Sequence, residues 1–316
     1  MLNSSQKIKI SKVVIYLFCF LFLLFANAQE QEAKVNRELL ELFKEWRNFE
    51  MPPLKDGVPD YSKNTFDFRF IQYKKLRGRL DSFSIDFWPV HDQVDWYLLW
   101  AEMNGYLFNY KILKPWERDP AFYKSIWTYK SDVPAHEGPT PHFTVELWQY
   151  DFPLNKKDRI KLLSSLELIP EFNKQAKINL TGNARDLWIA GIRDIEKQTQ
   201  ILEGLTLKPG VAKDKKLVMQ IKNAKDSTDD FVKWLKKEAF KKNGPSGIGK
   251  ENYTWYQQNV HLVPMTWEDE VFLLKRELAR AWSSLKLEEH RNRNLPELKP
   301  ADSPFSYKKL AENAAK

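Results

Sequence analysis

Histidines carry the clearest chemical potential in this chain, because a neutral imidazole can bind a metal or move a proton near neutral pH. The 316-residue sequence holds five of them, His91, His136, His142, His261 and His290. A zinc-peptidase helix needs two histidines four residues apart with a glutamate after the first, which places both imidazoles on one helix face. Only His136-Glu137 begins this way, and Pro139 is incompatible with the helix. The sequence therefore lacks the zinc helix.

Two other histidine placements leave a metal alternative open. His136 and His142 are spaced so that they could hold a metal across a loop, although hydrogen bonding within the loop is the favoured interpretation. His91 and Asp95 lie one helical turn apart, where capping or core pairing is favoured over ligation. We expect no metal-binding residue in this chain.

The remaining reactive side chains form no recognisable catalytic arrangement. Gly247-Ile-Gly249 lacks the Lys-Ser/Thr ending of a phosphate-binding loop, and Ser246 has no nucleophile elbow around it. Adjacent carboxylates such as Asp229-Asp230 diverge in direction on a helix, whereas acid–base catalysis needs convergent groups. We expect no catalytic and no cofactor-binding residue, so the chain should be inactive by itself.

The first 28 residues have the composition of an export leader. Lys7, Lys9 and Lys12 precede the apolar run 13–25, and Ala26-Asn27-Ala28 offers a small-x-small cleavage site. This run is shorter than the roughly 20 residues that span a membrane. The pattern predicts a signal peptide cleaved after Ala28 and a periplasmic or secreted protein that meets the membrane only through this leader. An uncleaved N-terminal anchor is the alternative.

Charge and composition exclude several classes of protein. Cys19, the only cysteine, lies in the predicted leader, so residues 29–316 hold no disulfide and no thiolate metal site. Three of the lysines behind the net charge of +8 also belong to the leader. The basic stretch 208–242 is interrupted by five acidic residues, which is typical of a solvated helix face and not of a nucleic-acid surface. The 12 Trp and 20 Phe residues indicate a thick aromatic core or a stacking surface for sugars or peptides.

The elements that must position any site are helical by their periodicity. Apolar stripes predict a helix that ends before Pro52-Pro53, a second after the turn 59–62, and a third from Pro89 toward Pro115. Asp119-Pro120 predicts the cap and first turn of a short helix. Asn155 predicts a further cap, followed by a helix that we expect Pro170 to interrupt.

The later helices are longer. The sequence predicts a helix over 184–203, a coiled-coil-like helix from Leu217 to Ala239, and a helix that begins at Thr266, before an extended polar segment over 296–304. No strand pair shows a hairpin pattern. The fold class is thus mainly α, a multi-helix array with a proline-rich irregular segment near 128–142, which is the one place where the pattern leaves room for a β-hairpin.

Several segments carry a resemblance to a known family. They are Phe43-Lys-Glu-Trp-Arg47, Asp60-Tyr-Ser62, Gln93-Val-Asp95, Ala101-Glu-Met-Asn-Gly105, Leu113-Lys-Pro-Trp-Glu-Arg-Asp-Pro120, Gly249-Lys-Glu-Asn-Tyr253, Asn259-Val-His-Leu-Val-Pro264, Glu277-Leu-Ala-Arg280 and Leu287-Glu-Glu-His-Arg-Asn-Arg293. Together they resemble the N-terminal half of the bacterial domain-of-unknown-function family eight-eight-five, helical proteins grouped with the zincin-type metallopeptidases. The likeness covers about residues 37 to 294.

The resemblance implies a helical scaffold and a peptide substrate. It also implies that zinc would be present only in a full-length relative, because the family's zinc helix lies in a C-terminal half that maps onto no residue here. The leading hypothesis is an exported helical scaffold over 29–316 that forms one wall of a peptidase-like cleft, non-catalytic alone and partnered by a missing catalytic half. The alternative is a self-sufficient aromatic binding module for a peptide or polysaccharide, and an independent hydrolase is the third hypothesis.

The missing half would leave apolar surface in water. The helix after Thr266 carries a wide apolar stripe, and we expect Leu274, Leu278 and Trp282 to line an exposed patch. Such a chain should bind a hydrophobic dye or self-associate.

Overall fold

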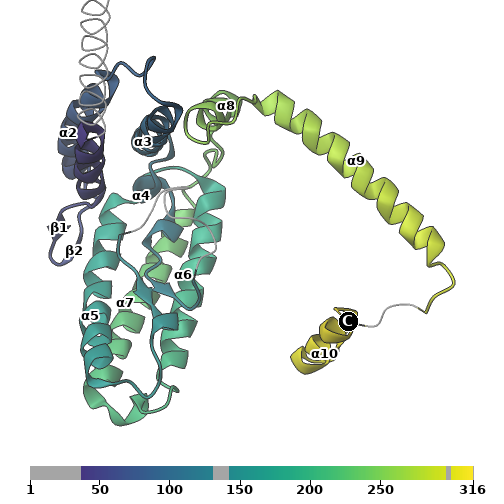
Figure 1. Cartoon of the computed structure of the whole chain (residues 1–316). Coiled ribbons are helices and arrows are strands. Elements are labelled where there is room, and N and C mark those ends of the chain that lie inside the picture. The colour runs from purple at the N-terminus through teal and green to yellow at the C-terminus, as the bar shows by residue number, and fades with distance from the viewer. Residues whose placement is uncertain (1–36, 131–141, 297–299, 316) are drawn as a thin grey trace, which may run out of the picture. The chain divides into compact units, whose positions relative to one another are not determined.

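Helices make up nearly all the regular structure in the computed structural model, which describes residues 37–130, 142–296 and 300–315. The chain divides into two compact units, Met1–Pro264 and Met265–Lys316 (Figure 1). The mainly α fold class predicted from periodicity is confirmed. The predicted leader and most of the predicted irregular segment lie outside the described residues.

The first unit begins with a layer of three helices. It comprises a helix over residues 37–50, α2 (Lys63–Asp81) and α3 (Val90–Phe108). Their apolar stripes meet in one buried core around Leu42, Trp46, Leu80 and Met103. Pro52 and Pro53 follow the first helix, as expected, because proline cannot continue the backbone hydrogen-bond ladder.

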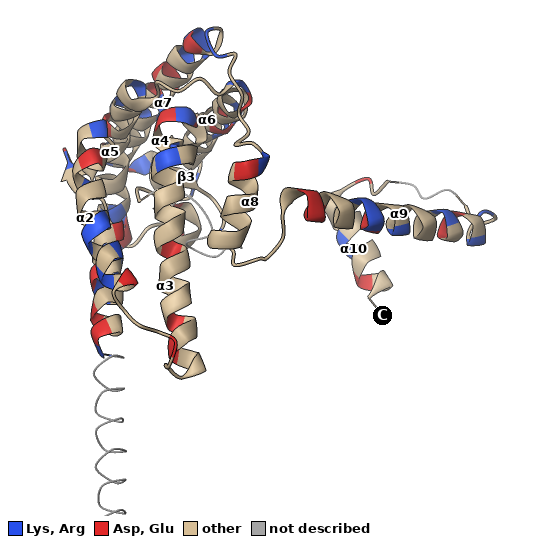
Figure 2. Cartoon of the chain, turned by 90° about the horizontal axis from the view of Figure 1, so that it is seen from above, with Lys and Arg blue, Asp and Glu red and all other residues tan. Residues whose placement is uncertain are grey.

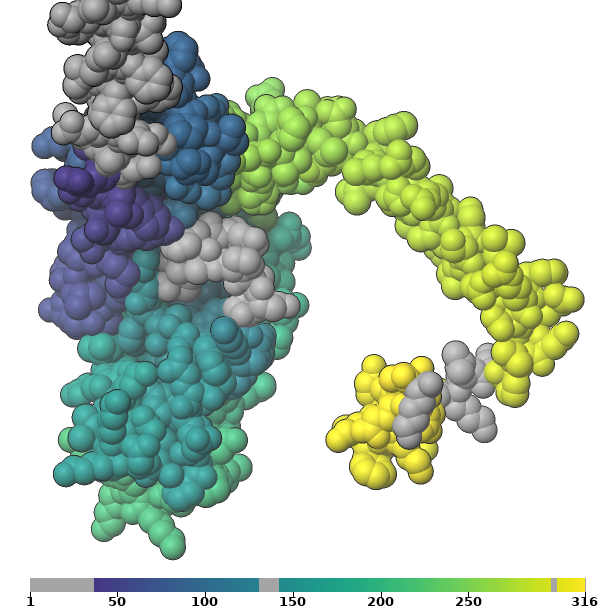
Figure 3. Space-filling model, viewed as in Figure 1, coloured from purple at the N-terminus to yellow at the C-terminus, as the bar shows by residue number. Residues whose placement is uncertain are grey.

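A three-helix bundle forms the larger core of the same unit (Figure 1). Its members are α5 (Lys156–Asn179), α6 (Arg185–Leu205) and α7 (Lys215–Ala239). The predicted caps are present, since Asn155 accepts a hydrogen bond from the Asp158 amide and begins α5. The alternating stripe of α7 is buried, and the teal part of the chain, which includes α5, covers the lower front of this unit in Figure 3.

Short elements lie between the longer helices and after α7. In chain order they are η1, a π-helix (Asn109–Leu113), α4 (Pro115–Arg118), η2, a 3₁₀-helix (Pro120–Tyr123), β3 (Ile126–Trp127), β4 (Val145–Glu146), η3 (Leu147–Gln149), η4 (Val211–Lys213) and α8 (Lys250–Asn259). Asp119 caps η2 by accepting the Ala121 amide at 2.8 Å, as predicted. The fully buried Gln198 of α6 accepts the amides of Ser125 and Ile126 and so fixes β3 on the bundle.

The position of the β-hairpin corrects the sequence-based expectation. β1 (Leu54–Lys55) pairs antiparallel with β2 (Val58–Pro59), and Asp56 and Gly57 form the turn with φ of 51° and 82°. An Asp-Gly pair is the strongest short hairpin pattern, because both turn residues need positive φ. The expectation of no hairpin pattern outside the proline-rich middle was therefore wrong. At the borders of that middle, β3 and β4 pair in parallel and not as a hairpin.

Pro170 does not interrupt its helix, contrary to the expectation. It lies inside α5, which runs unbroken from Lys156 to Asn179. A proline in a helix interior costs about 3 kcal/mol. The helix face around it buries Leu166, Ile169 and Phe172 completely, and burial of such side chains contributes about 1.5–3 kcal/mol each. Tertiary packing outweighs the local preference of proline.

Charges on the bundle surface are interleaved, as the sequence predicted. On α7, Lys222 pairs with Asp226 at 2.5 Å and Lys225 pairs with Asp229 at 3.0 Å, each one helical turn apart. Figure 2 shows both signs of charge on this helix. This pattern is typical of a solvated helix face.

The second unit holds α9 (Trp267–Arg291) and α10 (Pro304–Ala314). Thr266 and Asp269 form a reciprocal capping box at the start of α9, where the sequence placed the helix start. The expectation did not include α10, which Ser303 caps and Pro304 begins. The exposed fractions of Leu274, Leu278 and Trp282 on α9 are 64%, 58% and 54%.

Candidate ligand-binding pocket

A pocket of about 370 Å³ lies in the first unit, where the two cores meet. This volume is in the usual range for small-molecule sites. Its lining residues come from five helices, short connecting elements and loops: Arg47, Glu50, Met51, Pro52, Tyr61, Phe66, Arg69, Glu102, Gly105, Tyr106, Asn109, Pro115, Trp116, Phe122, His142 and Tyr256.

One wall of the pocket is aromatic. Phe66 of α2 stacks on Trp116 of α4 with ring centroids 3.6 Å apart and planes 15° apart. Tyr61 meets Phe122 edge to face at 4.9 Å. Trp116 reaches this wall because Lys114 adopts a left-handed conformation (φ 42°), which ends η1 and starts α4 in a new direction. The wall offers flat apolar surface for a side chain or ring of a ligand.

One face of α3 forms a further part of the lining. Glu102, Gly105, Tyr106 and Asn109 follow one another at three- and four-residue spacing, so they share this face into the start of η1. A π-helical turn is rare and is frequent at functional sites.

Helix α8 covers the end of α3 beside the pocket. Trp255 stacks on Phe108 at 5.7 Å, and the Asn104 side chain donates to the Asn259 carbonyl at 2.9 Å. A Cβ at Gly105 would lie 3.4 Å from the Val260 side chain, so this face of α3 packs closely against the residue that follows α8. The docking brings Tyr256 to the pocket lining.

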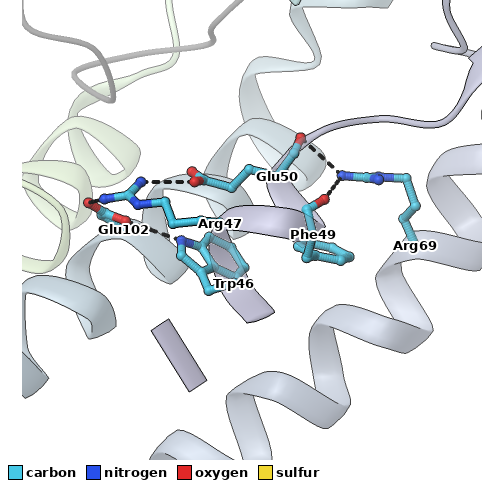
Figure 4. A network of polar contacts seen from close by, with 6 residues as sticks. All are labelled: Trp46, Arg47, Phe49, Glu50, Arg69 and Glu102. Carbon is cyan, nitrogen blue, oxygen red and sulfur yellow. Dashed lines mark hydrogen bonds and ion pairs between the residues drawn. The ribbon is translucent and has the colours of Figure 1, made fainter. Parts of the chain in front are cut away.

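Three charged side chains form a network at the end of the first helix (Figure 4). Arg47 donates to Glu50 at 2.8 Å and to Glu102 at 2.6 Å, and Trp46 donates its indole N–H to Glu102 at 3.1 Å. The two carboxylates thus converge on one guanidinium, which joins the first helix to α3.

Arg69 lies at the other side of the same helix end (Figure 4). This side chain of α2 is only 6% exposed, and its guanidinium donates to the carbonyls of Phe49, Glu50 and Met51. Those carbonyls belong to the end of helix 37–50, where the helix dipole is negative. The guanidinium also lies over the Phe49 ring, 4.5 Å from its centroid.

Burial determines the direction of the pKa shift in two tyrosines close to Arg69. Loss of hydration raises the pKa of Tyr61 and of Tyr106, and the charge of Arg69 only partly opposes both shifts. Both hydroxyls therefore stay protonated at neutral pH. They can serve as hydrogen-bond donors in the pocket but not as bases.

The structure describes four of the five histidines, and one of the four lines the pocket. His142 lines the pocket and donates its backbone N–H to the Tyr61 hydroxyl at 2.9 Å, while His136 lies outside the described residues. His91 is near Asp92, at 3.2 Å, and not paired with Asp95. Across residues 37–130, 142–296 and 300–315, no group of three or more His, Cys, Asp or Glu side chains is placed to hold a metal.

No helix in those ranges is long and apolar enough to cross a membrane.

Among the pocket residues, sequence reasoning singled out only His142, as an alternative metal ligand. Arg47, Tyr61, Glu102, Gly105 and Trp116 nevertheless all fall in segments that carry the family resemblance. The segments are spread over residues 43–120, so only the tertiary fold reveals that they meet. The shared resemblance was the sequence signal that could have pointed to these residues.

Comparisons with known proteins identify a similar fold but no matching family. No protein-family model matches the chain, and no curated protein matches it. A solved structure from Shewanella oneidensis, described as "a putative lipoprotein of unknown function", is similar with a TM-score of 0.51 and 15% identity. The match covers 88% of this chain and 51% of that one, so the chain spans about half the length of the structure it resembles.

Proposed function

We propose that this chain is a helical peptide-binding scaffold that forms one wall of the substrate cleft in a peptidase-like protein. The pocket between the two cores carries this proposal, because it joins an aromatic wall to polar groups in a volume suited to a ligand. The resemblance to family eight-eight-five supplies the peptide substrate class. Six pocket residues lie in the segments that carry this resemblance.

The chemistry of the lining supports binding more than turnover. The carboxylates of Glu50 and Glu102 are held by Arg47, and the pocket tyrosines are kept protonated by burial. A general base must reach the proton that it accepts, and both carboxylates are already engaged by the Arg47 guanidinium. The network instead fixes the shape of the pocket.

The proposed partner is a catalytic half that supplies the second wall. The similar structure from Shewanella is about twice as long as the matched region, which is compatible with a larger architecture of this fold. In this proposal any zinc chemistry belongs to the catalytic half.

We propose that the protein is exported to the periplasm or beyond the cell. The leader pattern in residues 1–28 supports this location, and the similar structure is described as a lipoprotein, a class of exported protein. Expression in a bacterium followed by N-terminal sequencing of the periplasmic fraction should give Gln29 as the first residue. Recovery of a chain that begins at Met1 would contradict cleavage.

The second candidate function is a self-sufficient binding module for a peptide or polysaccharide. One observation favours it: every residue that lines the pocket belongs to the first compact unit. Such a module would bind its ligand without a catalytic half. Six Phe, Tyr and Trp side chains line the pocket, and their rings are suited to stacking on sugars as well as peptides.

The test is direct binding by the full chain purified from the periplasm. A fluorescein-labelled pool of random octapeptides should show a saturable rise in anisotropy, and a labelled oligosaccharide should not. Met51→Ala should weaken peptide binding about fivefold, because it removes roughly 1 kcal/mol of apolar contact at the pocket edge. Met219→Ala is the matched control, since both methionines are about half exposed (60% and 52%) and Met219 lies on α7, outside the lining.

The outcomes separate the hypotheses. Binding of the oligosaccharide without the peptide would replace the peptide proposal with a polysaccharide module. Binding of neither ligand would refute both candidates. Hydrolysis of the peptides by this chain alone, retained after metal chelation and repurification, would show an independent hydrolase.

A further inference from the structure

Two lysine-rich segments meet at one end of the three-helix bundle. They are residues 156–161, at the start of α5, and residues 207–216, which connect α6 to the first turn of α7. The Arg159 guanidinium donates to Asp214 at 2.9 Å, and this ion pair joins the two segments. Together the segments form the basic end of the bundle, which is the lower end in Figure 1.

The net charge of the protein is concentrated at the basic end. Its two segments hold eight Lys or Arg residues and two Asp residues, a net charge of +6. The whole chain has a net charge of +8, and the predicted leader contributes three of these positive charges. The rest of residues 29–316 is therefore nearly neutral, so the charge of the protein is strongly polarised.

Six lysines of the basic end have no acidic partner among the described residues. Both aspartates of the segments are engaged, because Asp214 pairs with Arg159 and Asp158 accepts a hydrogen bond from the Asn155 side chain. All six lysines are exposed, and their charges are open to an anionic partner: Lys156, Lys157, Lys208, Lys213, Lys215 and Lys216.

Four of these lysines occupy positions that the helix dipole disfavours. Lys156 and Lys157 begin α5, while Lys215 and Lys216 begin α7, whose first turn holds no acidic residue. The start of a helix is its positive end, where acidic side chains stabilise and basic ones do not. By contrast, Lys236 near the end of α7 lies at the negative pole and pairs with an acidic side chain. Lysines that work against the stability of two helices point to a function for their charge.

Exposed apolar side chains lie among these lysines. Leu207, which precedes Lys208 in the connection between α6 and α7, is 85% exposed, and Ile160 in the other segment is 56% exposed. A soluble anion would neutralise the lysines but would offer the apolar side chains no favourable environment. The surface of an anionic membrane offers both, because lysines reach the headgroup phosphates while apolar side chains enter the acyl boundary.

We propose that the basic end docks the protein on an anionic membrane surface. The six lysines contact lipid phosphates, and Leu207 inserts at the level of the headgroups. This contact does not involve the leader, and it does not depend on the proposed peptide-binding function.

Docking in this way leaves the pocket open. Gln175 of α5 accepts the backbone N–H of the pocket residue Tyr61 at 2.9 Å, so this part of α5 lies beside the pocket. Roughly 28 Å of helix separates Gln175 from Lys156, at 1.5 Å per residue. Membrane binding and peptide binding can therefore be measured separately.

Vesicle sedimentation of the full chain purified from the periplasm tests the docking. Vesicles with about 30% phosphatidylglycerol in phosphatidylcholine should bind at least tenfold more strongly than pure phosphatidylcholine at low salt. Raising the salt to about 0.5 M should remove this preference, because exposed charges are then screened over a few ångströms. Equal binding to both kinds of vesicle, or binding to neither, would overturn the proposal and leave the peptide-binding proposal intact.

A matched pair of double variants tests the place of the charge. Lys215→Glu with Lys216→Glu should weaken binding to the anionic vesicles at least tenfold. The variant should be at least as stable as the unmodified chain, since acidic residues suit the start of α7, and it should bind the octapeptides equally well. Lys74→Glu with Lys75→Glu is the control, because these adjacent lysines are also exposed on a helix and the change in net charge is the same. Equal losses in both variants would show a dependence on total charge and contradict a defined docking end.

A leucine variant distinguishes a membrane from a soluble polyanion. Leu207→Ser should weaken vesicle binding about threefold to tenfold and leave the binding of dextran sulfate unchanged, because only the membrane accommodates the apolar side chain. Leu54→Ser, at a leucine of β1 that is 69% exposed, is the control and should change neither. Unchanged vesicle binding by Leu207→Ser would overturn the membrane assignment in favour of a soluble polyanion.

Discussion

Burial raises the pKa of an aspartate, whereas a hydrogen-bonded cation lowers it. Two aspartates in this protein show the two cases. Asp119 and Asp214 are both helix caps, and each accepts a backbone amide. Burial raises the pKa of Asp119 to about 6, while the hydrogen bonds from Arg159 lower the pKa of Asp214 to about 2. The same residue type in the same local role therefore has opposite effects on the dependence of stability on pH.

Asp119→Asn should stabilise the protein at pH 7–8 by about 1–3 kcal/mol, because the variant keeps an acceptor for the Ala121 amide and avoids a buried charge. A carboxyl group with a raised folded-state pKa lowers the unfolding free energy as pH rises from about 4 to above 6. The gain should thus disappear near pH 4. Urea unfolding at pH 4, 6 and 8 measures it, with the exposed Asp186→Asn as control. A gain that is independent of pH would contradict burial as the cause.

Asp214 should stabilise the protein above pH 4 and lose this effect as pH falls toward 2, because its folded-state pKa is depressed. Asp214→Ala removes both the cap on the Leu217 amide and the ion pair with Arg159, and should cost about 1–2 kcal/mol at pH 7. Asp214→Asn retains the cap and should cost less than half as much. Thermal unfolding of both variants at pH 7 provides the measurement, and equal losses would show that the ion pair contributes most of the effect.

At the scale of elements, the hairpin depends on local backbone conformation, whereas the long helices depend on tertiary packing. The turn of the β1–β2 hairpin requires positive φ at Asp56 and Gly57, which is a local backbone constraint. Helix α5 instead tolerates Pro170 because its apolar face is buried in the bundle. Turn residues are thus fixed by their own backbone, whereas a long amphipathic helix is fixed by what it packs against.

Two glycines test this contrast. Gly57→Ala should lower stability by about 1–2 kcal/mol, because φ is 82° and the new Cβ would lie 2.7 Å from the Leu168 side chain. Gly78→Ala, inside α2 with nothing within 4 Å of the new Cβ, should raise stability by about 0.5–1 kcal/mol. Denaturant unfolding of both variants measures the signs. A stabilising Gly57→Ala would refute strain at the turn.

At the scale of the whole molecule, the chain forms two units of different character. The first unit encloses both hydrophobic cores and the pocket. The second unit contains α9, whose apolar stripe has the exposed fractions given above for Leu274, Leu278 and Trp282. A contiguous exposed apolar stripe on one helix is typical of a surface that another protein segment covers.

The stripe should make the full chain bind a hydrophobic dye. Changing Leu274, Leu278 and Trp282 together to serine should reduce dye fluorescence by at least half, because it removes most of the apolar surface on that face. Serine at Lys275, Arg276 and Glu277 is the control on the same helix and should leave the fluorescence nearly unchanged. Fluorescence titration of a dye such as anilinonaphthalene sulfonate gives the readout. An unchanged signal in the apolar variant would place the dye-binding surface elsewhere.

The sequence alone determined the helices and their ends wherever the cause is local. The cap residues Asn155 and Thr266 and the periodic stripe of α7 act within a few residues, so their patterns predicted the elements correctly. The Asp-Gly turn was equally local and could have been predicted. Pro170 could not, because its tolerance depends on burial against other helices. The tertiary structure alone decided the pocket, since Arg47, Arg69, Glu102 and Trp116 act together only after helices distant in sequence pack side by side.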